Sequence, residues 1–215
     1  MKKYLAAALA LTATPAFAHH PLNGLPMETF SHGLLSGVGH PILGFDHLFF
    51  IVAVGILASF TASRLTAPLA YILTMLAGCV FVSLGFQMPL TEGLIVLSLL
   101  TLGGILASGR MTGQTATLAL FAAFGFVHGA AFGGTIAGQE GGAAATVFTG
   151  YLIGLAAIQY AIAIGAGWLA RTLFGATDAT ATNARLIGAG IAGVGAFLAL
   201  EIVEGPIVAA LTGAV

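Results

Sequence analysis

Apolar residues fill this chain in six long blocks, and short polar breaks separate each block from the next. Each block is long enough to cross a hydrocarbon layer about 30 Å thick as an α-helix. The breaks carry the arginines, prolines and other turn residues. The pattern predicts an all-α membrane protein with six transmembrane helices, at residues 43–61, 69–87, 90–108, 114–134, 144–170 and 186–204.

The first segment has the composition of a cleaved signal peptide. Lys2 and Lys3 precede a short apolar core that Pro15 interrupts, and Ala16-Phe17-Ala18 matches an Ala-x-Ala cleavage site. The core is too short to be a membrane span. We therefore expect three parts: a signal peptide at 1–18, a periplasmic segment at 19–42 that leads into the first helix, and a six-helix transmembrane domain at 43–215.

Composition excludes several classes of function. Of all residues, 59% are hydrophobic and 6% are charged, whereas a soluble domain carries about 25% charged residues. The net charge of −1 gives no basic field that would attract nucleic acid. The single cysteine, Cys79, cannot build a disulfide within the chain or a cysteine-rich metal site. Because no G-x-x-x-x-G-K-S/T run is present, we expect no ATP hydrolysis, and we expect no enzyme and no prosthetic group.

The positions of the arginines predict the orientation in the membrane. Positive side chains collect on the cytoplasmic side of membrane proteins. A chain that starts outside after signal cleavage places every arginine of the mature protein inside, whereas Glu92 and Glu140 lie in outer turns. The predicted protein crosses the bacterial inner membrane with both termini in the periplasm. The four arginines are Arg64, Arg110, Arg171 and Arg185.

Four ionisable residues near the outer face form a candidate metal site. His40, Asp46 and His47 lie at the entry to the first span, and His128 lies in the fourth span at a similar depth. Ionisable side chains inside a membrane usually mark a functional site. If one helix began by His40, His40 and His47 would share a face. Imidazole and carboxylate together suit divalent transition metals, and His128 borders a stripe of small residues typical of close helix contacts.

Other titratable residues are accessory candidates. Glu201 and Glu204 share a helix face and form either a proton or cation relay or an interfacial cap. His32 fits the interface better than a metal site. Signal cleavage would expose an amine at His19 beside His20, a pair that could chelate a metal.

The spacing of His40, Asp46 and His47 resembles the first signature of the HupE/UreJ family of bacterial nickel permeases. That signature is a histidine, five residues, and then Asp-His at the first span, and this chain matches it fully. The signal peptide and the expected spans also fit the family. The resemblance implies passage of Ni²⁺ from periplasm to cytoplasm for a hydrogenase or urease maturation system, with Co²⁺ as the next candidate.

The second signature of the family lies in the fourth span and is matched in part. Family members have Phe-His-Gly, then a second His-Gly, and then a glutamate. His128 and Gly129 match, whereas Phe132 stands at the position of the second histidine and Thr135 at that of the glutamate.

Two other classes of function stay open at this point. His47 and His128 on different spans could be the axial ligands of a haem in an electron carrier. Alternatively, the protein could hold metal for a partner system without transporting it. The leading interpretation is a secondary permease, in which ligands from the first and fourth spans strip water from a divalent ion near the outer face and movement of the packed helices then opens the inner side.

Overall fold

The structure, a computed structural model, describes residues 27–137 and 144–212, with side chains up to residue 204. The expected signal peptide, His19, His20 and Glu140 lie outside the described residues. The described part is all-helical, and its helices are α2 (Phe30–Leu43), α3 (Phe45–Ser59), α4 (Ala67–Ser83), α5 (Thr91–Ser108), α6 (Gln114–Ala137), α7 (Ala145–Thr172) and α8 (Thr182–Thr212).

Four of these helices, α5 to α8, are long and apolar enough to cross a membrane. The pair α2 and α3 would together add a fifth crossing, and α4 is a shorter apolar helix of 17 residues. From α4 onward each helix falls on a block that the hydropathy pattern predicted. An all-helical protein with several membrane-capable helices is therefore confirmed, and the count of six crossings stays a prediction.

The first predicted span is broken. Helix α3 begins at Phe45, and α2 precedes it at an angle of 82°. Gly44 ends one helix and starts the next: its N–H donates to the His40 carbonyl at 3.0 Å, and its own carbonyl accepts from Leu48 at 2.9 Å. The expectation that one helix carries His40 and His47 on one face is wrong, because the chain turns between them.

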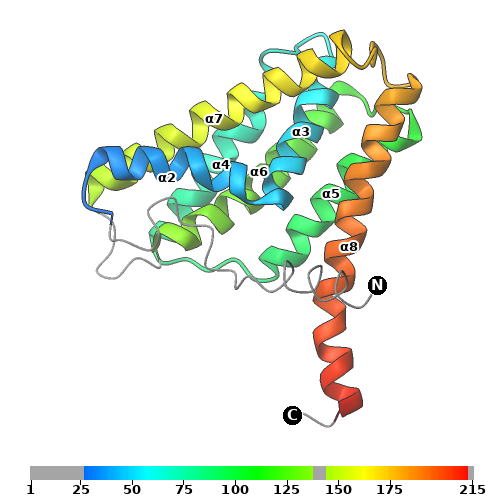
Figure 1. The fold of residues 1–215 in the computed structure, drawn as a ribbon. Helices are drawn as coiled ribbons and strands as arrows, with labels where there is room; N and C mark the ends of the chain where they lie inside the picture. Colours follow the sequence, from blue (N-terminus) through cyan, green and yellow to red (C-terminus); the bar gives the residue numbers. More distant parts are fainter. Residues whose placement is uncertain (1–26, 138–143, 213–215) are drawn as a thin grey trace, which may run out of the picture.

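Helix α3 lies at the centre of the bundle. It contacts every other described helix, and two thirds of its side chains, including Phe50 and Ile51, are buried. In Figure 1, α2 and α3 both lie against α7, while α4 pairs with α6 and α5 pairs with α8. In the first turn of α3, His47 faces into the bundle, whereas Phe45 is 70% exposed.

Glycines let the helices approach closely. The predicted stripe on α6 packs on α4, where a Cβ at Gly129 would collide with a backbone carbonyl. Gly33 and Gly37 of α2 meet the backbone of α7 in the same way. These contacts fix α6 and α2, the two neighbours that carry the other histidines of the candidate site.

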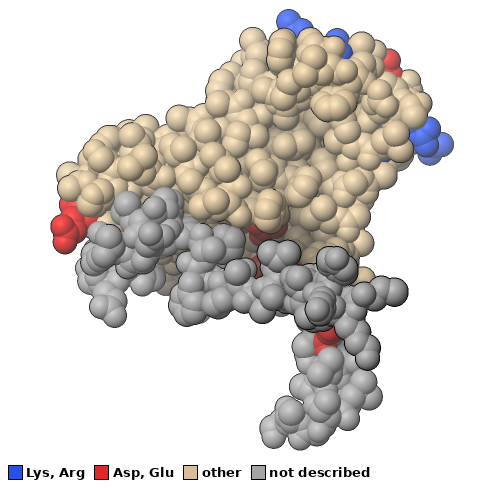
Figure 2. All heavy atoms as spheres, viewed as in Figure 1, with Lys and Arg blue, Asp and Glu red and all other residues tan. Residues whose placement is uncertain are grey.

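The described arginines gather at one end of the molecule. They lie in the α3–α4 connection, after α5, at the end of α7 and at the start of α8, and Figure 2 shows the visible Lys and Arg atoms at that end. This arrangement agrees with the alternation expected from the sequence. Which side of the membrane this end faces stays a prediction.

Candidate metal-binding site

The candidate site is built where the first turn of α3 meets α6. His47 is 7% exposed and His128 is fully buried. The break at Gly44 leaves room for this turn, since a Cβ there would lie 2.9 Å from Cδ2 of His47 and 3.2 Å from Oδ1 of Asp46. A side chain at this position would press on the acid and the imidazole and shift one or both of them.

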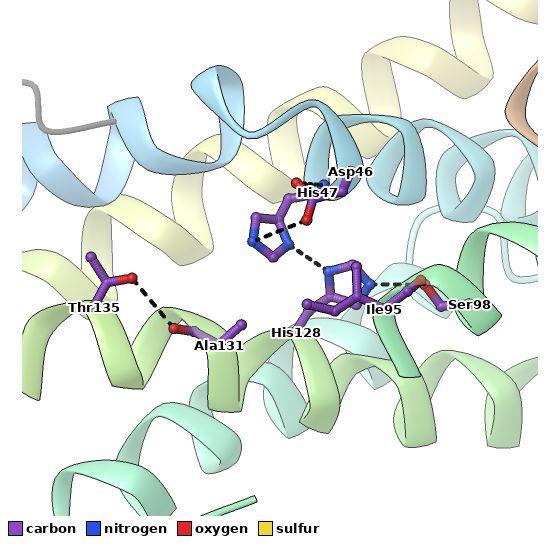
Figure 3. A network of polar contacts seen from close by, with 7 residues as sticks. All are labelled: Asp46, His47, Ile95, Ser98, His128, Ala131 and Thr135. Carbon is purple, nitrogen blue, oxygen red and sulfur yellow. Dashed lines mark hydrogen bonds and ion pairs between the residues drawn. The ribbon is translucent and has the colours of Figure 1, made fainter. Parts of the chain in front are cut away.

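The two histidines are in direct contact. Nδ1 of His47 lies 2.7 Å from Nδ1 of His128, and Nε2 of His128 lies 2.9 Å from the hydroxyl oxygen of Ser98 on α5. The Ser98 hydroxyl also donates to the carbonyl of Ile95 at 2.6 Å. Figure 3 shows this chain of contacts linking α3, α6 and α5. The structure thus joins His47 to His128, which the sequence placed at a similar depth.

The hydroxyl of Ser98 determines where the protons of this chain lie. A serine has one hydroxyl proton, and we assign it to the Ile95 carbonyl, which is the shorter contact at 2.6 Å, against 2.9 Å to Nε2 of His128. Ser98 therefore accepts from Nε2–H of His128. For two neutral imidazoles, Nδ1 of His128 then accepts from Nδ1–H of His47. The remaining nitrogen, Nε2 of His47, carries a lone pair, which is what a metal ion requires.

Asp46 lies on the side of His47 that carries this lone pair. Its Oδ1 accepts the backbone N–H of His47 at 2.8 Å, and its Oδ2 lies 3.9 Å from Nε2 of His47. The carboxylate is partly exposed, whereas the imidazole is buried. An ion between the two atoms would meet one oxygen and one nitrogen ligand.

Aromatic rings surround the two histidines. Phe50 stacks on His128 with ring centroids 4.0 Å apart. Phe132 lies 4.3 Å from the ring of His47 and 5.3 Å from that of His40, while the rings of His40 and His47 are 6.1 Å apart. His40 therefore stays near His47 although the helix is broken, and the side chain that stands in for the family's second histidine lies against both rings.

In this conformation the described residues contain no group of three or more His, Cys, Asp or Glu side chains arranged to hold an ion. Two nitrogens on one tetrahedral metal lie about 3.3–3.4 Å apart at bond lengths of about 2.0–2.1 Å. The 2.7 Å contact between His47 and His128 is too short for that. His128 positions His47 here, and a shared ion would require the two rings to separate.

A cavity of about 270 Å³ opens beside Asp46. Glu92 of α5 and Glu201 of α8 also line it, so three carboxylates from three helices face one space. Its apolar wall includes Ile95, whose carbonyl holds the Ser98 proton. A cation in this cavity would be attracted to the acid that stands next to His47.

The other predicted residues lie elsewhere. His32 is in the first turn of α2, where its Nδ1 accepts the Glu28 N–H at 3.2 Å, about 12 Å along the helix from His40. Glu204 is exposed one turn beyond Glu201 and does not line the cavity. Thr135 donates to the Ala131 carbonyl of its own helix at 3.4 Å (Figure 3).

Sequence reasoning missed Ser98 and the shared cavity of Glu92. A lone serine in an apolar helix gives no signal by itself, because it can bond its own backbone. Glu92 was placed in an outer turn from charge alone. A pairing of α5 with α3 and α8 would have been needed to bring it to Asp46.

The comparisons with known proteins give one family. The family profile described as "HupE / UreJ protein" matches residues 7–198. The chain is 35% identical over 101 residues to "Protein HupE" from Rhizobium leguminosarum bv. viciae, a match covering 46% of this chain and 50% of that protein. The matched region thus spans about half the length of the curated relative. No solved structure matches.

Proposed function

Because this chain belongs to the HupE/UreJ family, we propose that it is a secondary permease that moves a divalent transition-metal ion, most readily Ni²⁺, from periplasm to cytoplasm. The observation that carries the proposal is the acid–imidazole pair, Asp46 and His47, in the first turn of a broken helix inside the bundle. Broken helices of this kind hold the ion sites of many transporters.

Capture begins at the cavity that Asp46, Glu92 and Glu201 line. Carboxylates attract a hydrated cation and can replace part of its water shell, which is costly to remove in an apolar environment. Nε2 of His47 then offers an imidazole lone pair beside the Asp46 carboxylate. Imidazole suits Ni²⁺, Co²⁺, Cu²⁺ and Zn²⁺ better than Mg²⁺ or Ca²⁺, so the pair selects for transition metals.

Passage beyond His47 requires the contact between His47 and His128 to open. Opening frees Nδ1 of His128 as a further ligand on α6, with His40 close by on α2. The ion then moves from the pair formed by Asp46 and His47 toward a site that His47 shares with the histidines of α6 and α2. No nucleotide-binding motif is present in the chain, so in this proposal the driving force is the metal or proton gradient.

The metal and the recipient follow from the family resemblance rather than from geometry. Nickel for a hydrogenase or urease maturation system is the proposal, and cobalt uptake by the same route is the alternative within the family. A membrane protein that holds metal without moving it would use the same residues. The haem alternative is disfavoured, because the Asp46 carboxylate next to His47 fits a cation site better than the axial ligand of a haem.

Uptake of radioactive Ni²⁺ and Co²⁺ at trace concentration, in cells with and without the protein, tests the proposal. We expect His47→Ala and Asp46→Ala to abolish uptake while the protein stays in the membrane, since each removes one of two adjacent ligands. His32→Ala is the matched control, a histidine at the far end of α2, and should transport normally. Unaltered uptake in Asp46→Ala would overturn the proposed route, and metal binding without uptake in the wild type would favour the non-transporting role.

A further inference from the structure

A second cavity, of about 280 Å³, lies at the arginine end of the bundle, opposite the end at which α3 carries His47. The end of α3, the α3–α4 connection and the last turns of α7 form its walls. Gly55 of α3 and Gly167 of α7 are in the wall, and the lack of a side chain at each lets the two helices pack backbone to backbone beside the cavity. None of the described residues that line this cavity carries a carboxylate.

Two arginines line the cavity. Arg64 is exposed and makes no hydrogen bond or ion pair with any described residue. Arg171 donates through Nη1 to the carbonyls of Ser59 and Thr177, at 3.2 and 2.7 Å. A guanidinium has five N–H donors. The Nη2 and Nε donors of Arg171 therefore remain for a ligand, together with all five donors of Arg64.

Nearby negative charge does not neutralise these arginines. Among the described residues, no arginine forms a salt bridge with an acid. Asp178, the acid of the α7–α8 connection, accepts both the N–H and the hydroxyl of Thr180 at 2.9 and 2.6 Å. These hydrogen bonds hold the pKa of Asp178 below its usual value, so this acid stays ionised, but it is bound within its own turn.

The rim of the cavity is apolar and faces outward. Leu65 is 54% exposed and Trp168 is 60% exposed, and both line the cavity together with the two arginines. Tryptophan is enriched at the level of lipid headgroups because its ring is apolar and its N–H is polar. A soluble anion would gain nothing from this rim, whereas a lipid would place its acyl chains along it.

We propose that this cavity is a binding site for the phosphate headgroup of an anionic phospholipid, held by Arg64 and Arg171 with an acyl chain against Leu65 and Trp168. Basic pockets between membrane helices are suited to anionic headgroups. The site is separate from the proposed metal route and does not depend on it. It also does not depend on orientation, because the proposal concerns whichever leaflet the arginine end contacts.

Trp168 is the single tryptophan of the chain, so the tryptophan fluorescence comes from the rim of this cavity. The full chain is placed in liposomes of phosphatidylcholine that contain increasing fractions of either phosphatidylglycerol or phosphatidylethanolamine with brominated acyl chains, which quench tryptophan. We expect half-maximal quenching at a fraction of phosphatidylglycerol that is at least about fivefold lower than the fraction of phosphatidylethanolamine needed for the same effect. Arg64→Gln should lose about a fivefold preference, the weight of one basic side chain at an anionic surface.

Three controls decide the result. Arg64→Lys should keep most of the preference, and Arg110→Gln, an exposed arginine at the same end but outside the cavity, should keep all of it. Millimolar inorganic phosphate should not reverse the quenching. Equal quenching by the two lipids, an unchanged Arg64→Gln protein, equal losses in Arg64→Gln and Arg110→Gln, or reversal by inorganic phosphate would each overturn the lipid site.

Discussion

Replacing Ser98 by alanine tests the proton arrangement at the candidate site. Ser98 touches neither Asp46 nor His47, yet it accepts from His128 and thereby leaves Nε2 of His47 with its lone pair. In Ser98→Ala the acceptor is gone. His128 then regains a hydrogen bond if its proton moves to Nδ1 and is donated to Nδ1 of His47. This arrangement places the proton of His47 on Nε2, beside Asp46.

The size of the effect follows from one buried hydrogen bond. Such a bond contributes about 0.5–1.5 kcal/mol net, and leaving a buried N–H without an acceptor costs about 1–3 kcal/mol. A bias of about 1–1.4 kcal/mol is about a five- to tenfold change in the tautomer ratio. Because only one tautomer can bind, the apparent metal affinity falls with the fraction of that tautomer, by at most the same factor. The maximal uptake rate should change little.

The assay combines uptake kinetics with nitrogen NMR of the purified protein labelled at histidine. We expect a half-saturating Ni²⁺ concentration raised by up to about five- to tenfold and a proton shifted from Nδ1 to Nε2 on His47. Ser59→Ala is the matched control, because the Ser59 hydroxyl donates to the Ile56 carbonyl at 2.7 Å in the same way but meets no histidine. Wild-type tautomers in Ser98→Ala, or an equal loss in Ser59→Ala, would refute the reasoning.

Three further outcomes are expected. Phe132→His places an imidazole between the rings of the two N-terminal site histidines and should raise Ni²⁺ affinity at least severalfold in a direct binding titration, whereas lower affinity would argue against a metal at this point. Gly129→Ala drives a methyl into a carbonyl of α4 and should destabilise the protein by about 1–3 kcal/mol. The measurement is the fall in melting temperature in detergent. Gly134→Ala is the control and should leave the melting temperature unchanged, because the space around Gly134 is open. A reporter that works only outside the cytoplasm should be active after Val215 and silent near Arg110; activity near Arg110 would reverse the orientation.

The helices could be predicted from the sequence because length and hydropathy determine them in lipid. Helix α6 begins at Gln114, where the apolar block begins, and α7 covers 145–172 against a predicted 144–170. The stripe around Gly129 also predicted a close helix neighbour, which is α4. Such features are local or follow a period, so one sequence is enough to find them.

The break at Gly44 and the role of Ser98 could not be predicted in the same way. Pro41 lies in the last turn of α2 and not in the first turn of a spanning helix. The chain turns at Gly44 because α2 packs along α7, a contact between distant segments that hydropathy does not reveal. The function of Ser98 likewise depends on α5 lying beside α6. That the four predicted residues bind metal stays a prediction.

The break at Gly44 also has an electrostatic consequence for any ion at this site. A helix carries a partial negative charge at its C-terminus and a partial positive charge at its N-terminus, each about half an elementary charge. Helix α2 ends and α3 begins at this one point, so both charges meet beside His47. Asp46 lies in the first turn of α3 and offsets the positive end, which leaves the negative end of α2, with His40 in its last turn, to attract a cation. In an unbroken helix neither charge would exist at this depth, so a substitution that straightened the chain at residue 44 would weaken cation binding without removing a single ligand.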